Sequence, residues 1–478
     1  MKHFQSSVTA ILIVDLLATS GDVTLSWTSP MYPKLYSNDT SVNPLGRPIS
    51  PDEDSWIGSL LNLGAIIGPY PYAIIAGKIG RRIALLAVAL PQIISFLIMA
   101  FAKHIYLFYF ARFLAGLAVG AGYSLLPMYI AEISRDDNRG AMSLTLNVFW
   151  AIGNFLPYVL GPFLTVYWFN TALAIIPITF LVLFTISVPE SPYYLVEVGE
   201  IEKAEETIML LRSLSKEEVQ EELSSIKAYL KQTEDGNFWD IIKDKTLRKA
   251  LLICLVLIVS QELSGFCAIT YHLEPIFESA STNISADLSA FIVGFVLLIS
   301  SFVAPFLVDR AGRKALIICS CLGMCLALTL LGIFFHIQDL NYCTKSINWI
   351  PIFSLMWYIV FFNLGICSVP WTLTSELFPN NVKQIASSTI TSFCWVTSFT
   401  TTKTFNDMNQ WIGKSGTFWV FAVSCLCCAI FSIFYVPETK GKSFSEIQNM
   451  LQSVKIREVE IDKKSGVIKD VEKGIYLN

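Results

Sequence analysis

The sequence contains little charge for its length. Only 15% of its 478 residues are Asp, Glu, Lys or Arg, whereas 54% are hydrophobic. A soluble domain of ordinary composition has about 25% charged residues. A chain this apolar cannot cover its surface with polar groups, so much of that surface must face lipid. The net charge of −4 and the lack of a basic stripe with interleaved aromatics give no indication of a nucleic-acid partner.

The sequence also lacks the patterns of a disulfide framework, a metal site or an enzyme. Of its eleven cysteines, only Cys343 falls in a predicted outside loop, and it has no partner there. Cys425, Cys427 and Cys428 cluster inside an apolar segment without zinc-site spacing, which favours packing over metal binding. No nucleophile–base set or phosphate loop is evident. We therefore expect neither a cofactor nor a metal, and no enzymatic activity.

What the sequence does contain is a series of long apolar runs. A helix needs about 20 apolar residues to cross a bilayer, and these runs lack the alternation of barrel strands. They predict an all-α membrane protein with twelve transmembrane helices in two sets of six. The predicted spans are 8–29, 56–76, 83–102, 106–128, 142–162, 167–187, 249–271, 288–308, 315–336, 349–372, 384–405 and 416–436.

The short loops between these spans predict the orientation. Basic residues concentrate in alternate loops, which places those loops in the cytoplasm. Both termini then lie inside, and the sequons at Asn38 and Asn283 lie outside, where they could be glycosylated. The residues of the basic loops are Lys78, Arg81, Arg82, Arg135, Arg139, Arg310, Arg313 and Lys314. The predicted units are a six-helix bundle at 1–187, a linker at 188–248, a second bundle at 249–436 and a tail at 437–478.

The linker differs in kind from the spans. Ile201, Ala204, Ile208 and Leu211 recur at helical spacing, and so do Val219, Leu223, Ile226 and Leu230. Charged residues separate them, so the pattern predicts short amphipathic helices that do not insert into the bilayer. The tail after Pro437 is charged and without period, and we expect it to be mostly disordered.

Two loop motifs occur in both halves. Gly77–Arg82 is repeated as Asp309–Lys314, and each follows the second span of its set. Glu132 precedes Arg139 by seven residues, as Glu376 precedes Lys383. Such paired repeats indicate a duplicated six-helix unit. Because guanidinium groups bridge well to carboxylates, we predict that a cytoplasmic network gates the halves. Its members are Arg81, Glu132, Arg139, Glu190, Arg310, Arg313 and Glu376.

The segments that follow the sixth and twelfth spans carry a family resemblance. Pro189-Glu190-Ser191-Pro192 and Pro437-Glu438-Thr439-Lys440-Gly441 resemble two signatures of the sugar porter family, within the major facilitator superfamily. Trp27-Thr28-Ser29-Pro30 resembles its insect trehalose-transporter branch. The resemblance implies facilitated transport of trehalose or a hexose across the plasma membrane by alternating access. A monomer would suffice, and the sequence does not determine the oligomeric state.

The resemblance also implies where the sugar binds. Gln261, Trp371 and Trp395 match family sugar contacts, and Asn147 stands where span 5 usually has glutamine. The chain departs from the family at five other candidate positions, where a common hexose would lose hydrogen bonds. These positions carry Glu262, Cys267, Leu297, Asn363 and Cys394, and we count Glu262 and Asn363 among the substrate-binding candidates. The tenth span lacks the family's glycine–proline run before Trp371, so we expect it to bend less.

Asp22 and Arg112 lie inside predicted spans, where a charge is costly unless it is paired or hydrated. In proton-coupled relatives an aspartate of the first span pairs with the arginine of the fourth, and Asp22 lies next to that position. The pair could be a static ion pair in a facilitator, or it could make the protein a proton symporter, in which case protons are a second partner. A third alternative is a membrane sugar sensor that binds sugar but transports it weakly.

Overall fold

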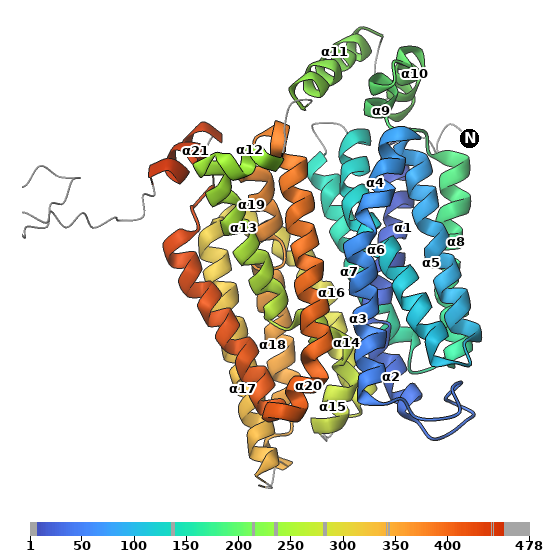
Figure 1. Ribbon diagram of the computed structural model, residues 1–478, viewed down its shortest axis with the longest axis vertical. Coiled ribbons are helices and arrows are strands. Elements are labelled where there is room, and N and C mark those ends of the chain that lie inside the picture. Colours follow the sequence, from blue (N-terminus) through green and yellow to red (C-terminus); the bar gives the residue numbers. More distant parts are fainter. Residues whose placement is uncertain are drawn as a thin grey trace, which may run out of the picture.

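The computed structural model describes residues 7–134, 139–212, 216–233, 238–280, 284–340, 342, 345–440, 442 and 444–453. The described chain is helical nearly throughout, and the helices stand side by side in two groups (Figure 1). The N-terminal group occupies one side of the molecule and the C-terminal group the other. The chain passes from one to the other through short helices at one end.

The first bundle contains six membrane crossings, two of which are each made of two helices. The first crossing consists of α1 and α2, and the second of α3 and α4. The helices are α1 (Ser7–Ser26), α2 (Thr28–Tyr36), α3 (Pro51–Ile67), α4 (Pro69–Lys78), α5 (Arg81–Phe101), α6 (Ile105–Ile133), α7 (Arg139–Leu160) and α8 (Val166–Ser187).

The second bundle repeats this plan. Its first crossing is made of α13 and α14, and α15 follows beyond the apolar span. Its fourth crossing is made of two helices. Its last two crossings are the two parts of α20, which meet at a turn at Gly413. The helices are α13 (Lys245–Leu263), α14 (Phe266–Tyr271), α15 (Leu273–Ala280), α16 (Ala286–Ala311), α17 (Arg313–Asp339), α18 (Ile350–Leu364), α19 (Val369–Leu377) and α20 (Asn380–Tyr435). A short 3-10 turn, η2 (Lys345–Ile347), precedes α18.

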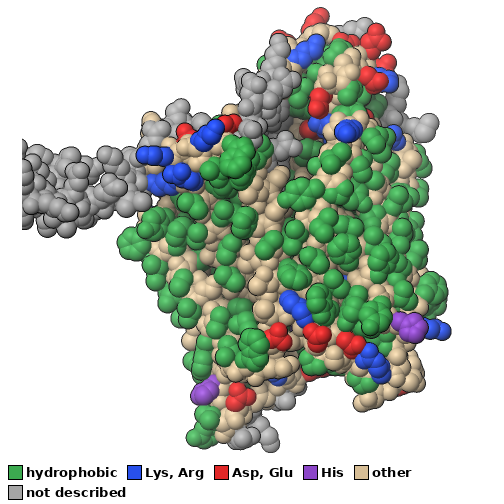
Figure 2. Space-filling view, in the orientation of Figure 1, with side chains coloured by type: hydrophobic (Ala, Val, Ile, Leu, Met, Phe, Trp, Pro, Cys, Tyr) green, Lys and Arg blue, Asp and Glu red, His purple; other side chains and the backbone are tan. Residues whose placement is uncertain are grey.

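The helix lengths fit twelve crossings. Among the described residues, ten segments are long and apolar enough to span a membrane, and Thr145–Leu160 is a shorter apolar helix. One of the ten, Asn381–Tyr435, is 55 residues long and is interrupted at Gly413, whose φ of 73° is not helical. It therefore supplies two crossings. Figure 2 shows the matching surface, a broad hydrophobic belt with charged side chains gathered above and below it.

Several crossings are broken near their middle, which exposes backbone groups where a site can form. The break between α13 and α14 falls at Gly265, whose φ is 87°, and a Cβ there would lie 2.4 Å from the Phe421 ring. Only glycine meets both conditions. The tenth crossing breaks between Gly365 and Ser368, so the expectation of a straighter helix was wrong. Pro370 lies in the first turn of α19, and because it has no N–H it cannot continue the hydrogen bonding of α18 across the break.

The segment between the bundles forms α9 (Pro192–Glu197), α10 (Ile201–Arg212), α11 (Lys216–Thr233) and α12 (Phe238–Lys243). The two amphipathic helices predicted from the sequence are present as α10 and α11. Their apolar faces pack together in one cluster that includes Leu195, Ala204, Ile208, Val219, Leu223 and Ile226. The helix α21 (Phe444–Ser453) lies at the same end of the molecule (Figure 1). We call this end the linker face, and the end that carries α2 and α15 the opposite face.

Candidate functional site

Just before the break between α13 and α14 lie two buried polar side chains, each with one oxygen that lacks a hydrogen-bond partner. Gln261 and Glu262 occupy the last turn of α13 and are 7% and 3% exposed. Oε1 of Gln261 and Oε2 of Glu262 are buried without a hydrogen-bond partner. The other oxygen of Glu262 accepts a weak bond from the Cys394 thiol, with an S–O distance of 3.5 Å. Buried polar groups are normally paired, so these atoms point to a ligand that supplies the missing partners.

Aromatic rings from both bundles lie next to these polar atoms. Trp395 of α20 follows Cys394 directly and meets Tyr123 of α6 edge-on, with ring centroids 5.4 Å apart. Tyr123 stacks on Trp150 of α7 at 4.7 Å. Nε1 of Trp395 is a further buried polar atom without a partner. An aromatic face flanked by open hydrogen-bonding atoms is suited to a sugar, whose ring has an apolar face and polar edges.

Asp22 lies in the same region, but both of its carboxylate oxygens already accept hydrogen bonds from the protein. Its Oδ1 accepts a hydrogen bond from the Tyr123 hydroxyl at 2.8 Å, and its Oδ2 accepts one from the Asn154 amide at 2.5 Å. The three side chains come from α1, α6 and α7. Two donors on the two oxygens match a carboxylate ion, and they tie three helices of the first bundle together.

Arg112 is not the partner of Asp22 in this conformation, so the predicted ion pair is corrected. Its Nε donates to the carbonyl of Ile57 at 2.9 Å, and Nη1 donates to the carbonyl of Thr24 at 2.5 Å. Its guanidinium also lies 5.4 Å from the centre of the Trp27 ring. Thr24 lies in α1 and Ile57 in α3, so the guanidinium joins these two helices through backbone carbonyls in place of the carboxylate.

The other predicted contacts do not join this group. The Asn363 amide donates to the Ser300 hydroxyl at 2.6 Å and to the Leu297 carbonyl at 3.3 Å, and so links α18 to α16. Trp371 is half-buried against the core of the second bundle. Asn147 is exposed on the part of α7 nearer the linker face. Their roles in substrate binding stay predictions.

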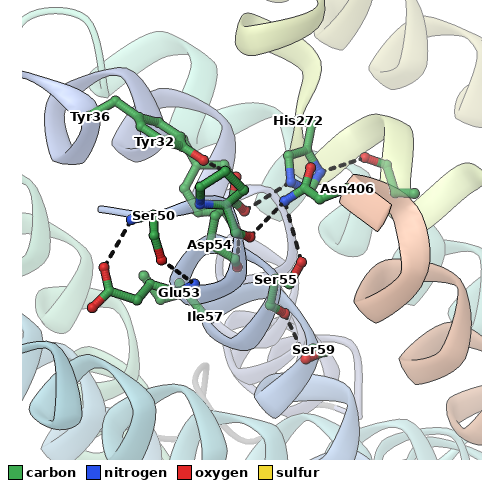
Figure 3. Close-up of polar contacts among 12 residues, drawn as sticks. Tyr32, Tyr36, Ser50, Glu53, Asp54, Ser55, Ile57, Ser59, His272 and Asn406 are labelled. Carbon is green, nitrogen blue, oxygen red and sulfur yellow. Dashed lines mark hydrogen bonds and ion pairs between the residues drawn. The ribbon is translucent and has the colours of Figure 1, made fainter. Parts of the chain in front are cut away.

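The two bundles are fastened together at the opposite face, at a set of contacts that we call the seam. His272, at the α14–α15 junction, lies with Nε2 3.0 Å from Oδ1 of Asp54 on α3. Lys403 of α20 pairs with Asp52 at 2.7 Å, and the Asn406 amide donates to the Pro51 carbonyl at 3.1 Å. Figure 3 shows Asp54 between Tyr36, from its own bundle, and His272, with Asn406 beside them. These contacts close this face.

The predicted gating residues at the linker face form ion pairs within each bundle. Arg81 lies 3.5 Å from Glu132 and 2.9 Å from Glu197, and Arg313 lies 3.1 Å from Glu376. The side chains of Arg139 and Arg310 fall outside the described residues. Glu132 and Glu376 belong to the same bundles as their arginines, and Glu197 belongs to α9, so none of these described pairs joins one bundle to the other.

Glu190 and Glu438 occupy equivalent places in the two halves. Glu190 accepts from the backbone N–H of Arg82 at 3.0 Å, at the start of α5, and Glu438 accepts from that of Arg313 at 3.0 Å, at the start of α17. Such positions suit anions. Burial raises the pKa of Glu190 despite these bonds. Burial also disfavours the Glu438 anion, but backbone N–H donors, those of Lys440 and Arg313 among them, outweigh it and lower the pKa of Glu438.

The sequence is similar to known proteins over most of its length. Residues 31–451 match the family described as "Sugar (and other) transporter". The chain belongs to this family. Two relatives are called facilitated trehalose transporter Tret1. The protein from Polypedilum vanderplanki is 35% identical over 409 residues, covering 84% of this chain and 80% of the relative. That from Apis mellifera ligustica is 33% identical over 456 residues, covering 93% and 88%.

Solved structures of a bacterial member share the fold. The inward open conformation of the xylose transporter XylE from E. coli superposes with a TM-score of 0.74 at 25% identity, covering 92% of this chain and 99% of that one. A partially occluded inward open form of the same transporter gives a TM-score of 0.72 at 26% identity, with 91% and 100% covered. The chain is therefore a multi-pass membrane transporter of the major facilitator type, as the sequence motifs predicted.

The sequence interpretation missed residues of both the site and the seam, Tyr123, His272 and Asp54 among them. Tyr123 lies eleven residues after Arg112, three helical turns along the same face of α6, and that spacing could have indicated it. His272 and Asp54 had no such signal, because they come from distant segments that meet only when the bundles dock.

Proposed function

We propose that the protein carries a sugar across the plasma membrane, down its concentration gradient, by alternating access. The observation that supports this most is the set of three buried, unpartnered polar atoms on Gln261, Glu262 and Trp395, next to aromatic rings of both bundles. A sugar hydroxyl can donate to the two oxygens and accept from the indole N–H. A site shared by two bundles is exposed to one side or the other when the bundles rock.

The conformation of the carrier follows from the seam. Contacts such as His272 with Asp54 hold the bundles together at the opposite face, so we take this conformation to be open toward the linker face. The likeness to inward open forms of a related transporter supports the same choice. With the linker face in the cytoplasm, as the basic loops predict, the conformation is inward-facing and both termini are cytoplasmic.

The substrate that we propose is trehalose or a hexose. Relatives named as facilitated trehalose transporters support this class, as does the combination of amide and indole groups in the site. The thiols at Cys267 and Cys394 are weak donors, so this site offers fewer strong hydrogen bonds to sugar hydroxyls than amides would. We expect correspondingly weak binding of a neutral hexose.

Proton symport is the second candidate, because Asp22 is a buried carboxylate beside the site. Its two hydrogen bonds to Tyr123 and Asn154 favour the facilitator, since they stabilise the anion where it is. A relay would have to break both bonds in each cycle. We therefore rank facilitated diffusion first.

The direct test is an uptake panel in cells that lack endogenous sugar carriers, with labelled trehalose, glucose, xylose and a polyol. We expect saturable uptake of at least one sugar, exchange of labelled for unlabelled sugar across the membrane, and no accumulation above the external concentration. Surface labelling of the same cells confirms delivery. A carrier that reaches the surface and neither takes up nor exchanges any of these compounds contradicts the proposal.

The orientation has a separate test. Asn38 is exposed in the loop between α2 and α3 at the opposite face, and we propose that it is glycosylated there. Asn283 falls outside the described residues, and its glycosylation stays a prediction. Asn38→Gln should remove a glycosidase-sensitive mobility shift, and Thr40→Ala should do the same because it also destroys the sequon. Cleavage of the 188–248 segment by protease added outside intact cells would contradict the proposed orientation.

A further inference from the structure

We propose that Glu262 makes the central site select sugars that carry an ammonium group over neutral sugars of the same shape. This inference rests on the proposed function and names a substrate class for the same site. The starting observation is that Glu262 is 3% exposed, one of its oxygens has no hydrogen-bond partner, and the other accepts from a thiol. A buried carboxylate in such surroundings is costly unless a ligand completes it.

Among the described residues, no cationic side chain balances a negative charge on Glu262. Asp22 adds a second carboxylate, and its own bonds come from the neutral donors Tyr123 and Asn154. The described guanidinium at this depth, that of Arg112, donates to the backbone carbonyls of Ile57 and Thr24 instead. When both are ionised, Asp22 and Glu262 carry one more charge than the guanidinium of Arg112 can balance. No described lysine or histidine forms an ion pair with Glu262 or Asp22.

The rest of the site suits a cation joined to a sugar ring. Tyr123 and Trp150 are stacked at 4.7 Å, and Trp395 meets Tyr123 edge-on at 5.4 Å. Aromatic faces attract cations as well as apolar ring surfaces. The free oxygen of Gln261 accepts from a hydroxyl or from an ammonium group. An amino sugar can therefore use the carboxylate, the amide and the rings together, whereas a neutral sugar leaves the charge of Glu262 unmatched.

The experiment measures competition for binding to the purified full-length carrier in nanodiscs at about pH 6, where an amino group of ordinary pKa is protonated. The probes are glucosamine, glucose, trehalose and N-acetylglucosamine, which keeps the nitrogen but not its charge. We expect glucosamine to bind at least about tenfold more tightly than glucose or N-acetylglucosamine, as for a charge-assisted hydrogen bond. Glu262→Gln should remove that preference, and Glu262→Asp should retain part of it.

The control for exchanging a buried carboxyl group for an amide is Glu274→Gln. Glu274 is also a buried carboxyl group with an unpartnered oxygen, but it lies on α15 at the opposite face, away from the site. The Glu274→Gln substitution should leave the preference for glucosamine over glucose unchanged. Equal binding of glucosamine and glucose, or a preference that survives Glu262→Gln, overturns the inference.

The remaining outcomes separate the inference from the proposed function. Binding and transport of glucose without binding of glucosamine overturn the inference and leave the proposed function standing. Uptake of a neutral sugar whose pH dependence disappears in Glu262→Gln assigns the residue to proton binding and also overturns it. Failure of all four sugars to bind a folded carrier overturns both.

Discussion

His272 and Asp54 join the two bundles at the opposite face, with Nε2 of the imidazole 3.0 Å from Oδ1 of the carboxylate. The side chains are 5% and 4% exposed, so this contact is shielded from water. The Tyr36 hydroxyl, 2.8 Å from the second oxygen of Asp54, fixes the orientation of the carboxylate (Figure 3). In the alternating-access cycle that we propose, this pair would be made when the opposite face is closed and broken when it opens.

We predict that His272→Ala shifts the carrier toward the state open at the opposite face. Loss of a buried hydrogen-bonding partner costs about 1–3 kcal/mol, which corresponds to roughly a 5- to 150-fold change in population. Deuterium uptake should rise in α3 and in α14–α15. His104→Ala is the control, because His104 is exposed near the same face. Unchanged exchange in His272→Ala would count against a latch role for the pair.

Replacement of Trp395 by alanine should impair sugar transport. The indole is 5% exposed, contacts Tyr123 of the other bundle and presents a free N–H. Loss of one aromatic contact and one hydrogen bond should lower kcat/KM by roughly 10- to 100-fold. Trp411→Ala, at an exposed position of the same helix, is the control. Normal initial rates in Trp395→Ala would remove this residue from the site.

Asp22→Asn distinguishes a facilitator from a symporter. We expect wild-type uptake to equilibrate without accumulation and to change little between about pH 5.5 and 7.5, a range through which a proton-coupling carboxyl group would have to titrate. Asp22→Asn should slow transport through the altered bonds to Tyr123 and Asn154. The measurement is uptake into proteoliposomes with and without an imposed pH gradient. Gradient-driven accumulation that disappears in Asp22→Asn would establish proton coupling instead.

Glu376→Gln should slow the transport cycle without loss of surface expression. Glu376 accepts from Arg313 at 3.1 Å and from the Thr439 hydroxyl at 2.6 Å, which ties α19 to α17 and to the segment after α20. Weakening a charge-assisted bond to a neutral one should reduce turnover by roughly 3- to 10-fold. Exchange rates normalised to surface-labelled protein test this. The exposed Glu221→Gln on α11 serves as control, and equal rates for both variants would exclude a gating role.

The stability of the protein should depend on pH through Glu274. Burial, with Asp287 and Glu278 nearby, raises the pKa of Glu274 from 4.5 to about 8. Because the folded state holds this proton more tightly, the stability from Glu274 is complete below about pH 4.5 and is lost as pH rises toward 8. Each tenfold difference in proton affinity corresponds to about 1.4 kcal/mol.

We therefore expect the apparent Tm of the wild type to fall between about pH 5 and 8 by a few degrees more than that of Glu274→Gln, on the order expected for a few kcal/mol. The exposed Glu202→Gln on α10 should follow the wild type. Parallel Tm curves for the wild type and Glu274→Gln would refute the assignment.

The sequence by itself determined the fold class, because span length and loop charge follow from the bilayer and not from packing. It also determined the internal duplication, through the repeated loop motifs, and the two amphipathic helices α10 and α11, through their period. The break after Gln261 and Glu262 could also have been predicted, since Gly265 follows closely after them, but the span 249–271 was predicted as one helix. These features depend on residues close together in the chain.

Only the tertiary structure decided which polar groups meet. Asp22 binds Tyr123 and Asn154, and Arg112 binds backbone carbonyls, although both charges were visible in the sequence. His272 reaches Asp54 across 218 positions of the chain. A buried group takes the partner that the docked helices place within hydrogen-bonding distance, and that distance depends on helix breaks and crossing geometry that no local pattern encodes.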